Sequence, residues 1–299
     1  MASAAEIKIR INSISETKKV TDAMYMISSV KMQRAKRENK KTEPYFNALR
    51  QEIGELLENI PQNNSRYFQN LDPDGIRGIA MLVITSDRGL SGAYNQTVLR
   101  AAEERLKERS DITPFVVGEF GRQYFAGKKI PYQEDFSYAM AFPTIREAQR
   151  ICADLLEYYD SDLVDQIEII YTHSPTFGAG VVRRKILLPL EYSEFYGSDK
   201  PEMNVGKEYY PSPESVLQGI VPSYLTGFVY SALVESYVSE QEARMTAMNT
   251  AGKNAEEMLK KLRIQYNSIR QAAITNEMIE ITSGTKALKK KRSTPAAEK

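Results

Sequence analysis

Ser86 and Asp87 are the residues whose types and position come nearest to those of a reactive or ligand-binding site. They follow a continuous apolar run, Ile79–Thr85, and open a turn-rich loop that contains Gly89 and Gly92. The apolar run predicts a buried parallel strand. In a doubly wound α/β fold, the loop after such a strand is where a phosphate or nucleotide binds. The chemistry of this loop would be a serine nucleophile, a metal ligand or a phosphate cradle.

The loop lacks the remaining parts of each of these sites. It is neither a G-x-G-x-x-G fingerprint nor a P-loop. The nearest approach to a P-loop runs from Gly121 to Gly127, with five residues between the glycines, and Lys129 stands where serine or threonine is required. No base is placed to activate Ser86. The only histidine, His173, excludes sites built on paired histidines and is predicted to be structural. We therefore expect no catalytic residue, no metal and no cofactor.

Composition excludes several further classes of protein. The chain has 299 residues, and Lys+Arg 40 against Asp+Glu 39 leaves a net charge of +1, so bulk charge favours no class of partner. The one cysteine, Cys152, excludes an internal disulfide and suits a reducing compartment. The chain has neither an uninterrupted apolar run of about 18 residues nor an N-terminal signal segment, which predicts membrane association only through partner subunits.

The middle of the chain, residues 76–210, alternates strands with helices. The expected strands are Ile79–Thr85, Phe115–Gly118, Gln166–Thr172 and Val181–Leu190, and the expected helices are 95–108, 119–127 and 144–159. The last two strands are joined through a turn at Pro175–Gly178, and residues 191–213 form a surface linker. Such alternation predicts a small, Rossmann-like α/β domain with a largely parallel sheet.

The C-terminal stretch, from Ser223 to about Leu288, has the pattern of one very long helix. No proline occurs between Pro222 and Pro295. Positions alternately three and four apart form a heptad seam, which predicts a helix that supercoils against another helix. Its apolar members are Val234, Tyr237, Met248, Ala251, Ala255, Met258, Leu262, Ile269, Ala272 and Ile279, and its polar members are Gln241, Arg244, Gln265 and Asn276.

Residues 3–59 have the pattern of a second long helix, the antiparallel partner of the first. One face carries Ile7, Ile11, Ile14, Thr17, Thr21, Met24 and Ser28. Pro44 is expected to bend or break this helix, and Pro61 with the cluster 62–65 to end it. The fold class is therefore α/β plus a long helical arm, an antiparallel coiled coil of the terminal helices with the α/β domain inserted. The expected divisions are 1–60, 76–210 and 211–299.

Basic side chains are concentrated in two places, residues 31–41 and 286–292. A solvated helix face, an acidic protein surface and a phosphate backbone each explain such runs. Aromatic residues do not alternate with the basic ones and no leucine seam is in phase with them, which weighs against nucleic acid. A nucleotide-binding α/β enzyme with a coiled-coil arm and a basic coiled-coil scaffold remain alternatives at this point.

Three stretches resemble, in order, the N-terminal helix, the central loop and the C-terminal helix of one family. They are Lys18–Lys31, Ile84–Asn95, and Ser239–Met248 together with Tyr266–Glu277. The family they resemble is the γ chain of bacterial F-type ATP synthase. Ser91 stands where the family commonly has cysteine, Asp22 where many members have a basic residue, and 289–299 extends past the usual end. No cysteine-pair insertion is present, so no thiol switch is expected.

The resemblance implies a non-catalytic, central-stalk rotor subunit. In that family the coiled coil passes through a ring of α and β subunits, and the α/β domain sits beside the ε subunit and the membrane c-ring. Its rotation couples proton flow to ATP synthesis or hydrolysis. The location implied is the cytoplasmic face of the bacterial plasma membrane.

The resemblance also implies which residues contact partners. Arg270, Gln271 and Thr275 match contacts to the β-subunit loops that catch the shaft. Glu240 and Arg244 match a contact cluster on the same helix. Met24 is expected to face the β lever region, and Lys31 and Arg34 its acidic loop.

Overall fold

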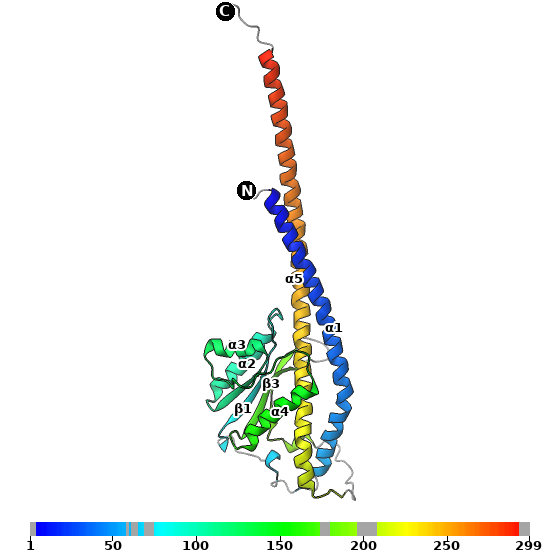
Figure 1. Ribbon diagram of the computed structural model, residues 1–299, viewed down its shortest axis with the longest axis vertical. Coiled ribbons are helices and arrows are strands. Elements are labelled where there is room, and N and C mark those ends of the chain that lie inside the picture. The colour runs from blue at the N-terminus through cyan, green and yellow to red at the C-terminus, as the bar shows by residue number, and fades with distance from the viewer. Residues whose placement is uncertain are drawn as a thin grey trace, which may run out of the picture. The chain divides into compact units, whose positions relative to one another are not determined.

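The two long helices expected at the chain ends are both present (Figure 1). The computed structural model describes residues 4–57, 60, 65–68, 75–173, 180–195 and 208–292. Helix α1 spans Ala4–Leu57 and helix α5 spans Pro213–Arg292. The first agrees with the expected 3–59, whereas the second begins at Pro213 and not at Ser223. The expected stop at Pro61 lies outside the described residues.

Neither long helix is interrupted by its internal proline. Pro44 lies inside α1, so of the bend or break expected there the break is excluded, and Pro222 lies inside α5, so the expected start after Pro222 was wrong. A proline within a helix costs about 3 kcal/mol through a lost hydrogen bond and a clash with the preceding turn. Leu217 and Val221 are fully buried on the turns before Pro222. Burial of two such side chains offsets a cost of this size.

Part of α5 is long and apolar enough, by length and composition, to cross a membrane. The 18-residue stretch that meets this test lies within Pro213–Lys286, and 56% of it is buried inside the protein. Burial of this kind is typical of a helix in a protein core.

The contacts of the chain define two units, and each contains a part of both long helices. One unit consists of Met1–Tyr25 with Met248–Lys299, and the other of Met26–Ala247. The division into 1–60, 76–210 and 211–299 that the sequence predicts follows the secondary structure instead, and it remains a proposal.

In the first unit, α1 and α5 pair antiparallel. Lys18 Nζ lies 3.0 Å from Glu256 Oε2, and a Cβ placed on Gly252 would lie 3.3 Å from Asp22 Oδ1. Position numbers therefore fall along α5 as they rise along α1, which confirms the expected antiparallel coiled coil.

The seam of α5 in this unit differs from the predicted one at alternate positions. Gly252 and Leu259 are buried, whereas Ala251 is half-buried and Met258 is exposed. Steps of three and four both continue a heptad pattern, so the sequence of α5 alone does not separate positions one residue apart. On α1, six of the seven predicted seam residues are buried or half-buried, and Thr17 is exposed.

The second unit contains a mixed four-stranded sheet with the order β2-β1-β3-β4. Its strands are β1 (Ile79–Ile84), β2 (Ile112–Val117), β3 (Gln166–His173) and β4 (Val181–Leu188). β1 pairs parallel with β2 and β3, and β4 runs antiparallel to β3. The largely parallel sheet is thus confirmed. The turn expected at 175–178 and much of the expected linker, 196–207, lie outside the described residues.

The two faces of this sheet are covered by different helices (Figure 1). Helices α2 (Tyr94–Glu108) and α3 (Glu119–Lys128) pack against alternate β1 residues such as Met81 and Val83. Helix α4 (Ile145–Asp160) packs with parts of α1 and α5 against the other face, which includes Leu82. A capping box starts α4, because Thr144 accepts from the Glu147 backbone N–H and Glu147 reciprocates. The long helices therefore supply one wall of the core of the α/β domain.

Candidate functional site

The polar residues predicted near the end of α5 lie on a surface that this chain leaves open. Arg270, Gln271 and Thr275 are all exposed. The Thr275 hydroxyl donates to the Gln271 carbonyl at 2.9 Å, which places these two residues on one face. From residue 270 to residue 286 every side chain of α5 is exposed, including Ile274 and Ile281. We call residues 270–286 the open end of α5.

The open end carries both apolar and polar side chains, and no other part of the described chain covers them. Exposed clusters of large aliphatic residues mark surfaces that bind another protein. The polar residues between them would need hydrogen-bond partners once they were covered.

Met24 and the basic residues of α1 occupy different environments. Met24 is half-buried, and Lys31 and Arg34 are exposed. The Arg34 guanidinium lies 4.5 Å from the centre of the Phe142 ring, so part of its charge already faces an aromatic group of this chain. The charge of Lys31 already acts on the buried Glu240 carboxyl, where it opposes the rise in pKa that burial causes.

Glu240 and Arg244 face the interior of the second unit. Glu240 is buried and Arg244 forms an ion pair with it, from one turn further along α5. Arg244 Nη1 also donates to the Gly89 carbonyl at 2.7 Å. Burial raises the pKa of the Glu240 carboxyl, and the charge of Arg244 opposes that shift. These residues join α5 to the loop after β1, and their contact with a partner subunit stays a prediction.

The loop after β1 does not present the groups of a nucleotide or nucleophile site. Ser86 is buried; its hydroxyl donates to the Arg88 carbonyl at 2.8 Å and accepts from Asn95 Nδ2 at 2.8 Å. Asp87 Oδ1 accepts from the backbone N–H groups of Glu119 and Met140, at 3.1 and 2.8 Å. Both side chains are committed to holding the loop. The edge of the sheet where doubly wound folds bind ligands is here tied to α5 through Arg244.

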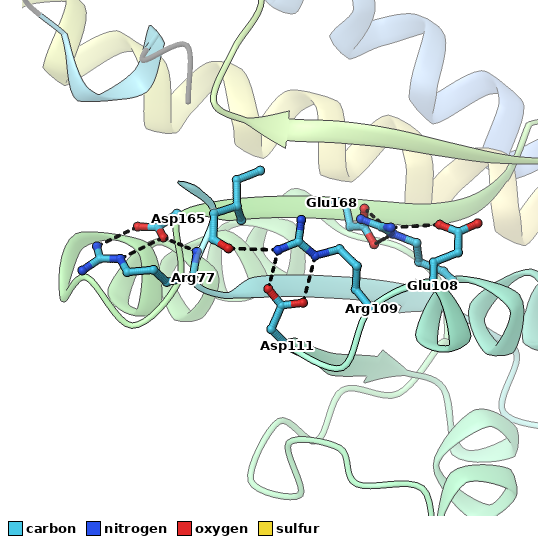
Figure 2. A network of polar contacts seen from close by, with 8 residues as sticks. Arg77, Glu108, Arg109, Asp111, Asp165 and Glu168 are labelled. Atoms are coloured by element: carbon cyan, nitrogen blue, oxygen red, sulfur yellow. Dashed lines mark hydrogen bonds and ion pairs between the residues drawn. The ribbon is translucent and has the colours of Figure 1, made fainter. Parts of the chain in front are cut away.

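The amino ends of the strands carry ion pairs that sequence reasoning did not single out (Figure 2). Arg77 pairs with Asp165 at 2.9 Å and Arg109 with Asp111 at 2.6 Å. In each case the hydrogen bond from the arginine lowers the pKa of the aspartate. The first pair joins the segments that enter β1 and β3, and Arg109 Nη2 also donates to the Ile76 carbonyl at 2.9 Å, which joins the segments that enter β2 and β1.

A third pair lies within the domain. Glu168, on β3, is buried and accepts from Arg105 Nε at 2.9 Å, and Glu108 also contacts Arg105 (Figure 2). The signal in the sequence is a glutamate amid the apolar residues of a strand, where a buried charge requires a partner. Its geometry is that of a structural ion pair.

Comparison with known proteins decides what this combination of helices and domain is. A family model described as ATP synthase matches residues 3–288. The ATP synthase gamma chain of Acetivibrio thermocellus is 37% identical over 300 residues, covering 97% of this chain and 100% of the relative. The gamma chain of Caldanaerobacter subterraneus is 38% identical over 291 residues, covering 93% and 98%. The chain belongs to the ATP synthase gamma chain family.

Solved structures agree with this at the level of the fold. A chain from the Euglena gracilis mitochondrial ATP synthase, 17% identical, aligns with a TM-score of 0.65 over 98% of both chains. A chain from the central stalk and c-ring of the Tetrahymena thermophila enzyme, 24% identical, aligns with a TM-score of 0.57 over 78% of this chain and 99% of that one.

Family membership confirms the resemblance found in the sequence. With its long arm and inserted domain, the chain is a member of the gamma chain family of ATP synthase. Family membership therefore decides against the two alternatives left open by the sequence, the nucleotide-binding enzyme and the basic scaffold.

Proposed function

We propose that this gamma chain transmits torque in a bacterial F1Fo ATP synthase through contacts at three places. The open end of α5 and the basic face of α1 engage the α3β3 ring. The α/β domain engages the ε subunit and the c-ring. The assembly lies on the cytoplasmic face of the plasma membrane and couples proton flow to ATP synthesis.

The open end of α5 is the observation that carries the proposal. From residue 270 to residue 286 the helix has no buried side chain, yet it exposes Ile274, Met278, Ile279 and Ile281. A long helix with such a surface would not remain free in water, because large aliphatic side chains gain about 1.5–3 kcal/mol each on full burial. A surrounding ring of subunits would cover all sides of the helix at once, as one partner on one side would not.

The basic face of α1 supplies an electrostatic contact. Lys31, Lys36, Arg37 and Lys40 are exposed within residues 31–41. Charges of one sign on one helix attract an acidic loop and raise the rate of encounter. The strength of this contact falls as salt rises, because exposed charges are screened within about 10 Å at 0.1 M ionic strength.

The mechanism is a mechanical shift of population. A helical rod whose sides differ presents each β subunit with a different surface in turn. A surface that contacts one conformation better than another shifts the equilibrium toward it by the difference in contact free energy. Arg270, Gln271 and Thr275 would provide that difference on one side of α5.

The substitution Met24→Lys tests the coupling. A lysine at this half-buried position adds a charge near the β lever and creates an ion pair in some rotor positions only. In the reconstituted F1Fo complex, ATP hydrolysis should be retained better than ATP-driven proton pumping. Met26→Lys is the matched control, since Met26 is exposed two residues along α1 and on another face. Equal loss of hydrolysis and pumping by Met24→Lys in an intact complex would contradict the proposal.

A further inference from the structure

A pocket of about 410 Å³ lies between α1, α4 and α5. All of its lining residues belong to the unit Met26–Ala247. Its lining includes Tyr45 and Phe46 from α1, Ile145 and Cys152 from α4, and Pro222 and Ser223 from α5. A cavity of about 150 Å³ is enough to hold a benzene molecule. A larger apolar molecule therefore fits in this one.

The aromatic side of the pocket is formed before any ligand arrives. The rings of Tyr45 and Phe46 lie edge to face, with centroids 5.2 Å apart and an interplanar angle of 69°. Phe46 packs directly over Gly227 of α5, where a Cβ would overlap its ring. The Phe46 ring is held between α1 and α5, so it loses little conformational entropy when the ring of a ligand stacks against it.

The opposite side carries no charge. The Cys152 thiol is buried, and burial raises its pKa to about 12, so it is a neutral group at neutral pH. At the rim, Lys41 Nζ lies 2.8 Å from Glu38 Oε1, so its charge is balanced within the chain. A carboxylate or phosphate ligand would compete with Glu38 for this ammonium group. The lining thus favours an uncharged molecule.

Three side chains of the pocket are available for a hydrogen bond to a ligand. Thr42 donates to the Asn39 carbonyl and Thr226 to the Pro222 carbonyl, both at 2.9 Å. The Tyr45 hydroxyl, the Gln149 amide and the Ser223 hydroxyl make no hydrogen bond within the described part of the chain, and of these only Ser223 is half-buried, the other two being exposed. A few polar groups among apolar walls fix the orientation of a small ligand.

We propose that the pocket between α1, α4 and α5 binds an uncharged aromatic molecule of about two fused rings that carries one hydroxyl group. The rings contact Tyr45, Phe46 and Ile145, and the hydroxyl bonds to Ser223. This inference goes beyond the rotor function, which requires no small molecule. Because the pocket exists only in the folded unit, an occupant also stabilises the unit by mass action.

Nuclear magnetic resonance of the full chain, with ¹³C-labelled isoleucine methyl groups, tests the proposal using 1-naphthol as the probe. The Ile145 methyl signal should shift saturably with one equivalent bound. Ile281, on the open end of α5, reports non-specific adsorption and should not shift. The thermal midpoint of the unit should rise over the same concentration range.

Two substitutions test the location. Ala153→Phe, on the pocket lining, should abolish the Ile145 response, whereas Ala48→Phe, at an exposed position of α1 outside the lining, should not. Ser223→Ala removes the hydroxyl with little change of volume and should weaken binding about five- to tenfold. The proposal is overturned if Ile145 does not respond, if Ile281 responds equally, or if both lining variants bind as the wild type does.

Discussion

Arg244 of α5 donates a hydrogen bond of 2.7 Å to the carbonyl of Gly89, in the loop that follows β1. The same guanidinium forms the ion pair with buried Glu240. One side chain therefore ties the long helix to the carboxyl end of the sheet and compensates a carboxylate that water does not reach. This joint fixes the position of α5 against the loop that follows β1.

Replacing Arg244 with methionine should lower the free energy of unfolding by about 3–5 kcal/mol, because Glu240 is left buried without its partner. The double variant Glu240→Gln with Arg244→Met removes both charges and should recover part of that loss. Urea denaturation of the full chain, followed by circular dichroism, measures the difference. Equal stability of the single and double variants would show that the pair is not coupled.

The pH dependence of the Arg244→Met variant follows from the pKa of Glu240. Burial raises that pKa, and removing Arg244 removes a charge that opposes the rise. A carboxyl whose folded pKa exceeds its unfolded pKa destabilises the fold as pH rises through that interval, and the penalty vanishes below the unfolded pKa. The stability deficit of the variant should therefore shrink as pH falls from about 8 toward about 5. The double variant should show no such change.

Tyr94 offers a contrasting case, a buried hydroxyl that lies beside the side chains of Ser236 and Thr172 and yet makes no hydrogen bond of normal geometry within the described part of the chain. Tyr94→Phe should leave stability within about 1 kcal/mol of the wild type or raise it, since no bond is lost. Tyr138→Phe is the matched control, because the Tyr138 hydroxyl donates to Asp154 at 2.8 Å. That variant should lose about 1–2 kcal/mol. A larger loss for Tyr94→Phe than for Tyr138→Phe would mean that the Tyr94 hydroxyl has a partner.

Much of this fold could be predicted because its signals are local and repetitive. The apolar run Ile79–Ile84 identified a central strand, and the absence of proline after Pro222 identified α5. The start of α5 could not be predicted, because Pro222 indicates a boundary and only the burial of Leu217 and Val221 overrides it. Packing with residues distant in sequence decided that boundary.

The sequence predicted which residues form the candidate site, but not which way all of their side chains face. Gln271 and Thr275 share a face, as their spacing implies. The spacing of Glu240 and Arg244 is that of an ion pair on a helix surface, yet this pair turns toward Gly89. The partner of Arg244 is a backbone carbonyl, which carries no signature in the sequence.

Gly227 is a position of α5 where only glycine fits against α1. A Cβ there would overlap the ring of Phe46 from α1. Gly227→Ala should therefore destabilise the unit by about 1–3 kcal/mol, and by less in a Phe46→Leu background. Gly219→Ala is the control, because no atom of the described residues outside its own turn of helix lies within 4 Å of its Cβ position, and it should stabilise α5 by about 0.5–1 kcal/mol. Thermal unfolding of the four variants measures the coupling, and simple additivity would exclude the contact.

The open end of α5 gives the prediction that bears most directly on catalysis by the complex. Gln271 and Thr275 lie exposed on one face, and the Thr275 hydroxyl already donates to the Gln271 carbonyl. Within a ring of apolar walls, the Gln271 amide would need a partner, and each buried hydrogen bond lost costs about 1–3 kcal/mol. Gln271→Leu and Thr275→Val should thus lower turnover of the assembled complex by about tenfold or more if the bonds form at the rate-limiting rotor angle. Helicity of the isolated chain should not change, because both side chains are exposed in it.

Thr282→Val is the matched control, as its hydroxyl makes the same contact to the carbonyl one turn earlier, at 2.7 Å from Met278. If both substitutions leave assembly, hydrolysis and proton pumping at wild-type levels, these residues are solvated positions of a coiled coil and take no part in selecting the tight site.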